Sequence, residues 1–165
     1  MTSKLIFALL LPLLLGHNSN ASPRIAVLDF ELNDISSLPN TPTERQRTAS
    51  LRPLLERSVR QSGDYTIVRI SADAQLAANP GFGYLFHFHD LAADLGRKYG
   101  ADWVVVGQHS KPSFLYSYLL VHLVDVRNRT LGANFAVELK GNHEKVTQHG
   151  AKAMASKIAG FLERQ

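Results

Sequence analysis

Two histidines and an aspartate in one short segment, His87, His89 and Asp90, are the residues best suited to do chemistry. Imidazole nitrogens and carboxylate oxygens are common ligands of zinc and copper. In an extended segment His87 and His89 would project to the same side, because side chains alternate along a strand. The three residues therefore form a candidate copper or zinc site; the alternative is that they are solvated or capping residues beside a helix start. A further ligand would have to come from His109, His143 or His149.

The same segment carries four aromatic residues at alternate positions: Phe82, Tyr84, Phe86 and Phe88. If the segment is extended, their rings line one edge, and exposed aromatic side chains commonly anchor protein partners. We therefore predict a partner-binding surface here. The alternative is that the rings fold back and cover the end of the sheet.

A hydrolase site is the weakest candidate. His109 precedes Ser110, but consecutive residues of a strand point to opposite faces and do not form a proton relay. The sequence shows no nucleophile elbow, phosphate loop or complete set of metal ligands. We therefore predict that the protein is not an enzyme and has no cofactor besides the candidate metal.

Strands and helices alternate along the chain and must position these residues. We expect strands at 24–30, 65–70, 103–107, 115–126 and 131–140, and helices at 41–63, 71–78, 90–99 and from Asn142 onward. Residues 31–40 are expected to form a loop. When the consecutive helices at 71–78 and 90–99 are counted as one helical segment, the order is β-α-β-α-β-β-β-α, which predicts a single-domain α/β layer sandwich with helices mostly on one face. Its sheet is mixed and ends in an antiparallel hairpin, which a final helix follows.

The hairpin turn at 127–130 sets the register of its two strands. A turn centred between Asn128 and Arg129 would pair Val124 with Ala133, and a three-residue loop would reverse the parity. The two other pairs expected from this turn are His122 with Phe135 and Leu120 with Val137. In this register an apolar stripe points away from the helices, and a second subunit, a loop or a partner must cover it. The stripe consists of Leu119, Val121 and Leu123; the alternative is burial by the chain's own segments.

Residues 1–21 have the pattern of a secretory signal peptide. Lys4 precedes an apolar run at 5–15, and small residues follow at 19–21. The run is shorter than the ~20 residues of a membrane-spanning helix, so we expect cleavage and no span in the mature chain. Residues 22–165 are then expected to form one periplasmic domain. Because the chain has no cysteine, no disulfide stabilises this domain.

The charge of the chain argues against one class of partner. The formal net charge is +4, and the basic residues are spread along the sequence instead of forming a stripe. Proteins that bind nucleic acid usually concentrate basic residues on one surface. We therefore predict no binding to nucleic acid.

Five segments of the chain resemble a secreted bacterial family of unknown function. They are residues 24–30, 100–107, 110–115, 124–126 and 139–142. That family is similar in layout to the TolB amino-terminal domain and to CsgG-like domains of curli secretion. The resemblance implies an α/β fold and a periplasmic location, and it assigns no active site.

Together these patterns predict a secreted, non-enzymatic α/β module that binds an envelope protein or forms a homo-oligomer. The alternative is a periplasmic metal-handling protein that uses His87, His89 and Asp90. A hydrolase is the least favoured function.

Overall fold

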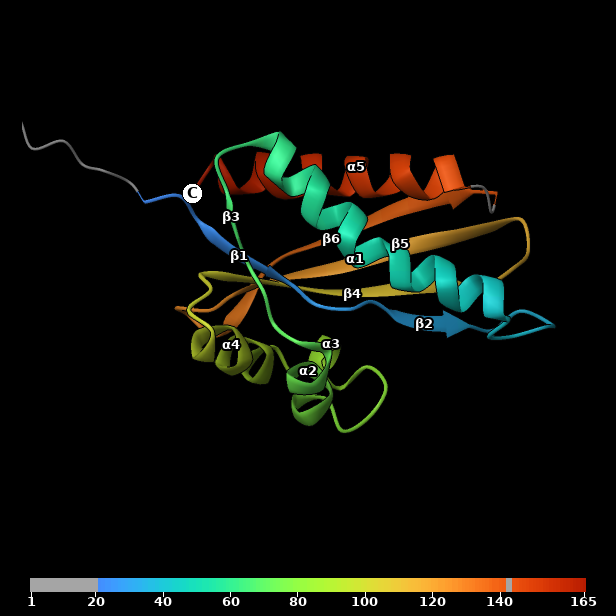
Figure 1. Cartoon of the computed structure of the whole chain (residues 1–165), viewed down its shortest axis with the longest axis horizontal. Coiled ribbons are helices and arrows are strands. Elements are labelled where there is room, and N and C mark those ends of the chain that lie inside the picture. Colours follow the sequence, from blue (N-terminus) through green and yellow to red (C-terminus); the bar gives the residue numbers. More distant parts are fainter. Residues whose placement is uncertain (1–20, 142–143) are drawn as a thin grey trace, which may run out of the picture.

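A β-sheet between two layers of helices forms the protein (Figure 1). The computed structural model describes residues 21–141 and 144–165. In these residues the strands are β1 (Arg24–Val27), β2 (Glu31–Asp34), β3 (Thr66–Val68), β4 (Trp103–Lys111), β5 (Tyr116–Asp125) and β6 (Thr130–Lys140). The helices are α1 (Pro42–Ser62), α2 (Ala72–Ala78), α3 (Tyr84–His87), α4 (His89–Lys98) and α5 (Glu144–Leu162). The predicted α/β layer sandwich is confirmed, but helices lie on both faces of the sheet rather than mostly on one.

The strand order β3-β1-β4-β5-β6 makes the sheet mixed, as predicted. Strand β1 is parallel to both β3 and β4, while β5 is antiparallel to β4 and β6. Strand β1 pairs in parallel with the first half of β4, and β2 pairs in parallel with its second half. Strands β1 and β2 therefore lie end to end beside β4. The predicted C-terminal hairpin and final helix are both present.

The first predicted strand, 24–30, is interrupted, and β2 lies in residues that were predicted to form a loop. At the interruption, the backbone N–H of Asp29 donates to Oε1 of Gln75 at 2.7 Å. Gln75 belongs to α2, and its amide in turn donates to the carbonyl of Asp29 at 2.9 Å. These side-chain bonds replace part of the β-ladder. They join residues far apart in sequence, so local sequence patterns do not reveal them.

The start of α1 agrees with the prediction. Pro42 is its first residue, and Oγ1 of Thr41 accepts a hydrogen bond from the backbone N–H of Glu44 at 3.3 Å. This bond satisfies one of the backbone donors that a helix start leaves free. Asn142, the predicted start of the last helix, lies outside the described residues.

The register of the hairpin differs from the prediction by one residue. Ala133 pairs with Leu123 rather than with Val124, and the other predicted pairs shift in the same way. Gly132 is the extra residue of a bulge between Leu123 and Val124. A Cβ atom on Gly132 would lie 2.6 Å from the ring of Trp103, so the close packing there requires glycine. The bulge reverses which side chains of the two strands share a face.

The prediction that Leu119, Val121 and Leu123 form an exposed stripe is therefore wrong. Their exposed fractions are 1%, 0% and 0%, and they belong to the core that α1 and α5 cover. The chain's own helices bury them, as the alternative had it. Because these side chains are inaccessible, they cannot contact a partner in the folded protein.

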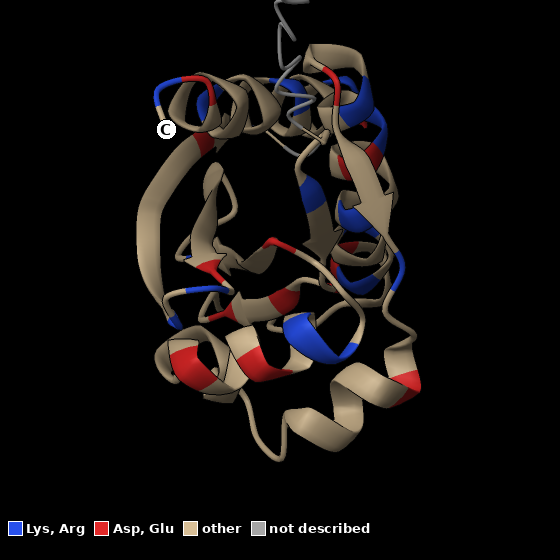
Figure 2. Cartoon of the chain, turned by 90° about the vertical axis from the view of Figure 1, so that its left-hand side faces the viewer, with Lys and Arg blue, Asp and Glu red and all other residues tan. Residues whose placement is uncertain are grey.

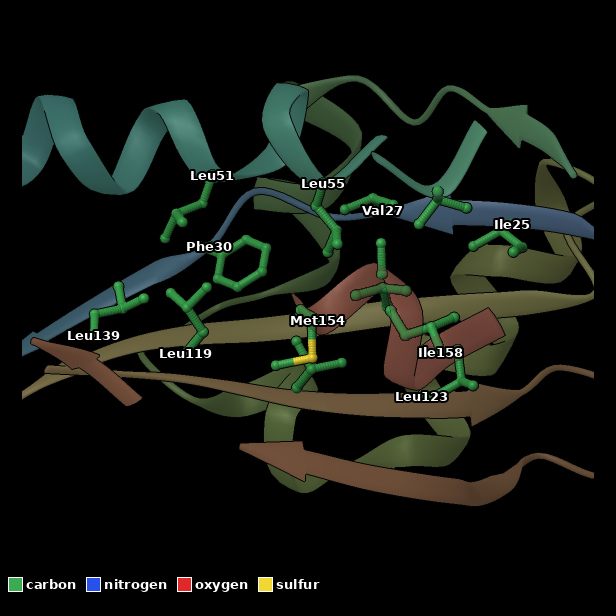
Figure 3. Close-up of a cluster of buried hydrophobic side chains, with 14 residues drawn as sticks. Ile25, Val27, Phe30, Leu51, Leu55, Leu119, Leu123, Leu139, Met154 and Ile158 are labelled. Carbon is green, nitrogen blue, oxygen red and sulfur yellow. The ribbon is translucent and has the colours of Figure 1, made fainter. Parts of the chain in front are cut away.

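The two faces of the sheet are covered to different extents. The core under α1 and α5 runs along the whole sheet (Figure 3) and includes Ile25, Val27, Phe30, Leu51, Leu55, Leu119, Leu123, Leu139, Met154 and Ile158. We call this the covered face. The core under α2, α3 and α4 includes Val104 and Val106 of β4 but no later residue of that strand. Among the described elements, no helix covers the half of this second face next to β2 (Figure 1).

Candidate functional site

The residues that were predicted to bind a metal ion lie at the junction of two short helices. His87 ends α3 and His89 begins α4, so the segment is not extended. Nε2 of His89 lies 2.9 Å from Nδ1 of His122, whereas Asp90 lies 3.8 Å from the guanidinium of Arg129. The described residues contain no group of three histidine, cysteine or acidic side chains placed to hold a metal ion.

The candidates for a further metal ligand do not join this segment. His109 is fully buried on the covered face, and His149 is exposed on α5, which packs on that same face. His143 lies outside the described residues. His87, His89 and Asp90 thus belong to the junction of two short helices, and their binding of a metal ion stays a prediction.

His122 was not singled out in the sequence, yet it organises this junction. Its ring stacks on that of Phe86 with centroids 3.7 Å apart, and Nδ1 lies 2.9 Å from the carbonyl oxygen of Phe86. Because a carbonyl only accepts hydrogen bonds, Nδ1 of His122 is the donor. Burial lowers the pKa of His122, the carbonyl of Phe86 opposes this shift, and the neighbouring His89 and His87 add to it. The neutral imidazole therefore joins the α3–α4 junction to β5.

The four aromatic residues do not form the predicted alternating edge, because α3 turns their rings in different directions. Phe82 and Phe88 are 62% and 50% exposed, whereas Tyr84 and Phe86 are half-buried. Glu31 anchors the segment, since its carboxylate accepts the backbone N–H of Gly83 at 2.9 Å. Phe82 and Phe88 remain available to a partner, and their role stays a prediction.

A second accessible surface lies on the uncovered half of the sheet, beyond α3. We call it the open face and define it by Tyr118, Leu120, Asn134 and Ala136. Side chains alternate between the two faces along a strand, and Leu119 and Val121 on β5 face α1 and α5. Leu120 and its cross-strand partner Ala136 therefore point away from the covered face. Tyr118 and Leu120 are half-buried, while Asn134 and Ala136 are exposed. Glu138, which pairs with Tyr118, adds an acidic group at the edge of this face. A pocket of about 220 Å³ connects the open face to His122 and Phe86.

On the covered face, a polar cluster lies beneath the apolar core at the β2 end of the sheet. His109 is fully buried, with Nδ1 2.8 Å from Oγ1 of Thr48 and Nε2 2.9 Å from Oγ of Ser117. Next to it, Nζ of Lys111 lies 2.8 Å from Oε1 of Glu44. Burial, followed by the nearby charge of an arginine, lowers the pKa of His109 to about 4. His109 is therefore neutral at physiological pH.

This cluster contains a serine–histidine pair, but its geometry does not favour catalysis. Ser117 is 1% exposed, so a substrate cannot reach its hydroxyl. The group on the other nitrogen of His109 is the hydroxyl of Thr48, not a carboxylate that would stabilise an imidazolium. Ser110, the serine considered in the sequence, lies on the opposite face of β4. The pair was missed because His109 and Ser117 meet only across the β4–β5 hairpin.

Acidic and basic side chains are interspersed on the molecule (Figure 2). On α1, Arg52 lies 3.0 Å from Glu56 and 3.3 Å from Asp29, so part of its basic charge is neutralised locally. In the view of Figure 2 the basic segments do not form one continuous stripe. The prediction that the protein does not bind nucleic acid is compatible with this distribution.

The chain matches a family model described as "Protein of unknown function (DUF2380)" over residues 23–158. The chain belongs to this family. The match begins within two residues of the first strand and extends into α5, so it includes the whole sheet and both helical layers. The resemblance seen in the sequence, to a family of unknown function, is thereby confirmed.

Solved structures share the fold at low sequence identity. A hypothetical protein from Chlamydia trachomatis aligns with a TM-score of 0.58 and 12% identity, covering 88% of this chain and 100% of that one. A PelC dodecamer from Paraburkholderia phytofirmans aligns at 0.54 and 14%, covering 86% and 89%. TolB from Acinetobacter baumannii aligns at 0.53 and 17%, covering 87% of this chain but 29% of TolB. The predicted likeness to TolB is therefore confirmed at the level of the fold, and no curated protein matches the chain.

The described helices were also compared with the requirements of a membrane span. None of them is both long enough and apolar enough to cross a bilayer. The predicted signal peptide lies outside the described residues.

Proposed function

We propose that this chain is an exported, non-enzymatic protein of the bacterial envelope that functions by binding another protein. The open face carries this proposal. It places Tyr118, Leu120 and Ala136 at the surface beside Asn134, and the charged neighbour Glu138 is paired with Lys140 at the edge of this group. Tyrosine and apolar side chains are typical of the central part of protein interfaces, whereas charges are more common at the rim. Phe82 and Phe88, both at least half exposed, extend the candidate surface.

Export rests on the leader pattern in residues 1–21. The family match begins at residue 23 and the first strand at Arg24, which agrees with a folded domain at 22–165 and cleavage before it. The absence of cysteine is compatible with the periplasm because two apolar cores provide the stability. We therefore place the mature domain in the periplasm.

The partner is either a different envelope protein or a second copy of this chain. The PelC structure, which shares the fold, is a dodecamer, so self-association is a form that this fold can take. The non-enzymatic role is supported by the burial of Ser117 and His109, the one serine–histidine pair that we find among the described residues. A protein that functions by binding needs no catalytic role for Ser117 or His109.

Site-specific photo-crosslinking in the native bacterium tests the proposal. A photoreactive phenylalanine analogue replaces Tyr118 or Ala136 on the open face, and Lys152, which is exposed on α5, serves as the control position. We expect a discrete adduct from the two open-face positions and none from position 152. Mass spectrometry of the adduct distinguishes a different protein from a second copy.

A charge on the open face provides the matched loss-of-function test. Leu120→Asp is expected to abolish the adduct formed at position 118, because a buried, unpaired carboxylate is costly at an interface. Lys152→Asp is the control. If neither open-face position forms an adduct, or if Leu120→Asp leaves the adduct unchanged, this face does not bind a partner.

A further inference from the structure

Four large apolar side chains protrude from two loops at one end of the molecule. Ile35 and Leu38, between β2 and α1, are 73% and 65% exposed. Phe114 and Leu115, between β4 and β5, are 53% and 78% exposed. We call these four residues the loop tip. Figure 1 shows both loops at the right-hand end of the long axis, beyond the arrowhead of β2.

The sheet topology brings the two loops together. Strands β2 and β4 are parallel and remain paired up to Asp34 and Lys111, so both loops leave the sheet at the same end. The backbone N–H of Ile35 donates to the carbonyl of Lys111 at 3.1 Å, and Leu115 accepts from Gly141 at 2.9 Å. The four side chains therefore lie at the same end of the sheet.

Buried charges fix the loop tip from below. The carboxylate of Asp34 accepts hydrogen bonds from the backbone N–H groups of Ser36 at 3.1 Å and Asn40 at 2.9 Å. The ammonium of Lys111 lies 2.8 Å from Glu44 and 5.4 Å from the centre of the Phe114 ring. Because these contacts hold both loops, the apolar side chains are presented to solvent in a preformed arrangement.

The loops themselves carry no charge, while basic residues flank them. Residues 35–43 and 112–118 contain no Asp, Glu, Lys, Arg or His. Lys140 pairs with Tyr116 at the base of the second loop, and its side chain is 82% exposed although its Nζ lies 3.8 Å from Glu138. Arg45 is exposed in the first turn of α1. Apolar and aromatic groups at the tip, with cations set back from it, match the depth profile of a bilayer surface.

We propose that the loop tip inserts into a lipid bilayer that contains anionic headgroups. Ile35, Leu38, Phe114 and Leu115 enter the boundary between headgroups and acyl chains, and Lys140 and Arg45 meet the phosphates. A protruding tip fits a fluid bilayer without a matching recess, whereas a protein partner would need a cavity of complementary shape. The proposal does not rest on partner binding at the open face, because the loop tip is a different set of residues.

Vesicle flotation tests the proposal with residues 22–165, which contain every described strand and helix. The probe is a vesicle of phosphatidylethanolamine and phosphatidylglycerol. The test variant, Leu115→Ser, removes a side chain of the tip that is 78% exposed. The matched control, Leu76→Ser, removes a leucine that is 72% exposed on α2, outside both the loop tip and the candidate partner surface.

We expect the unmodified protein and the control to float with the vesicles, and the vesicle partition coefficient of the tip variant to fall at least about tenfold. Binding to neutral phosphatidylcholine vesicles should be weaker, because the two cations lose their phosphate partners. Circular dichroism should show equal folding of all three proteins.

Three results would overturn the proposal. The unmodified protein could stay in the soluble fraction, or the tip variant could float as well as the control. The tip variant could also lose the crosslinked adduct of the open face while vesicle binding remained, which would identify the tip as a protein contact. Partner binding is measured by crosslinking of the protein without tip substitutions, so failure of the membrane proposal does not decide the proposed function.

Discussion

The two faces of the sheet use the same strands for different purposes. On β5 the odd-numbered residues Leu119, Val121 and Leu123 are at most 1% exposed under α1 and α5. The even-numbered Tyr118 and Leu120, on the other face of the same strand, are half-buried. Two long helices cover the first face, whereas three short helices cover half of the second. Both faces therefore contain a buried core, but only the second face has a half that no described helix covers.

His109 of β4 and His122 of β5 lie on opposite faces of the sheet and differ in burial in the same way. His109 on the covered face has no exposed surface and hydrogen bonds on both ring nitrogens. His122 on the other face is half-buried, and it contacts a second histidine, His89. The first is part of the core, while the second joins a surface junction to the sheet.

Truncation of one leucine on each face of β5 gives the largest expected contrast. Leu123→Ala should lower the free energy of unfolding by about 2–5 kcal/mol, because it leaves a cavity in a close-packed core. Leu120→Ala should cost less than about 1 kcal/mol, because the side chain is already partly in water. Urea denaturation measures both. Equal losses would break the distinction between the faces.

Acid should weaken the covered face through His109. Its pKa is about 4 in the folded protein and 6.5 without burial, so the unfolded chain binds more protons between these values. The free energy of unfolding is therefore fully retained above pH 6.5 and should fall by about 3 kcal/mol as pH decreases to 4. Urea denaturation at several pH values measures this fall. In His109→Gln the fall should be smaller by this amount, and identical profiles would assign the acid sensitivity to other groups.

Glycine substitutions probe the packing of the covered face. A Cβ atom on Gly107 would lie 2.4 Å from the ring of Phe30, whereas one on Gly81 would meet no atom within 4 Å. We expect Gly107→Ala to lower the free energy of unfolding by about 1–3 kcal/mol. Gly81→Ala, its control, should be close to neutral. Thermal unfolding of both variants decides the matter, and an unchanged Gly107→Ala protein would mean that Phe30 moves aside without cost.

The smallest expected effect concerns the α3–α4 junction. Burial lowers the pKa of His122, so this junction is most stable above the ordinary histidine pKa and loosens as pH falls below it. Hydrogen exchange of the amides at 84–92 should accelerate on acidification, relative to those of α1. Because His122→Phe keeps a ring against Phe86, it should reduce the acceleration. No difference between the two proteins would remove His122 as the cause.

The sequence predicted elements whose signals are local. The helix predicted at 41–63 corresponds to α1, and the strand predicted at 103–107 is the first part of β4. The predictions were wrong where contacts between residues far apart in the sequence determine the local structure. The bulge at Gly132 depends on the ring of Trp103, and no alternation of apolar residues reveals it. This single residue reversed the predicted faces of the hairpin.

The candidate site was predicted in part. The segment that contains Phe82 and Phe88 is indeed accessible at these two rings, but its helical shape depends on Glu31, which binds the backbone of Gly83. The contact of His89 with His122 joins residues 33 positions apart. Spacing within one segment could indicate which residue types were present, but not which ones meet.

The position of the chain ends has a practical consequence for experiments. Strand β1 begins at the end of the sheet opposite to the loop tip, and the C-terminus lies at that same end (Figure 1). An affinity tag or a fluorophore on either side of residues 22–165 is thus remote from the loop tip. When the protein is immobilised through such a tag, the tip faces outward, toward whatever is passed over the surface.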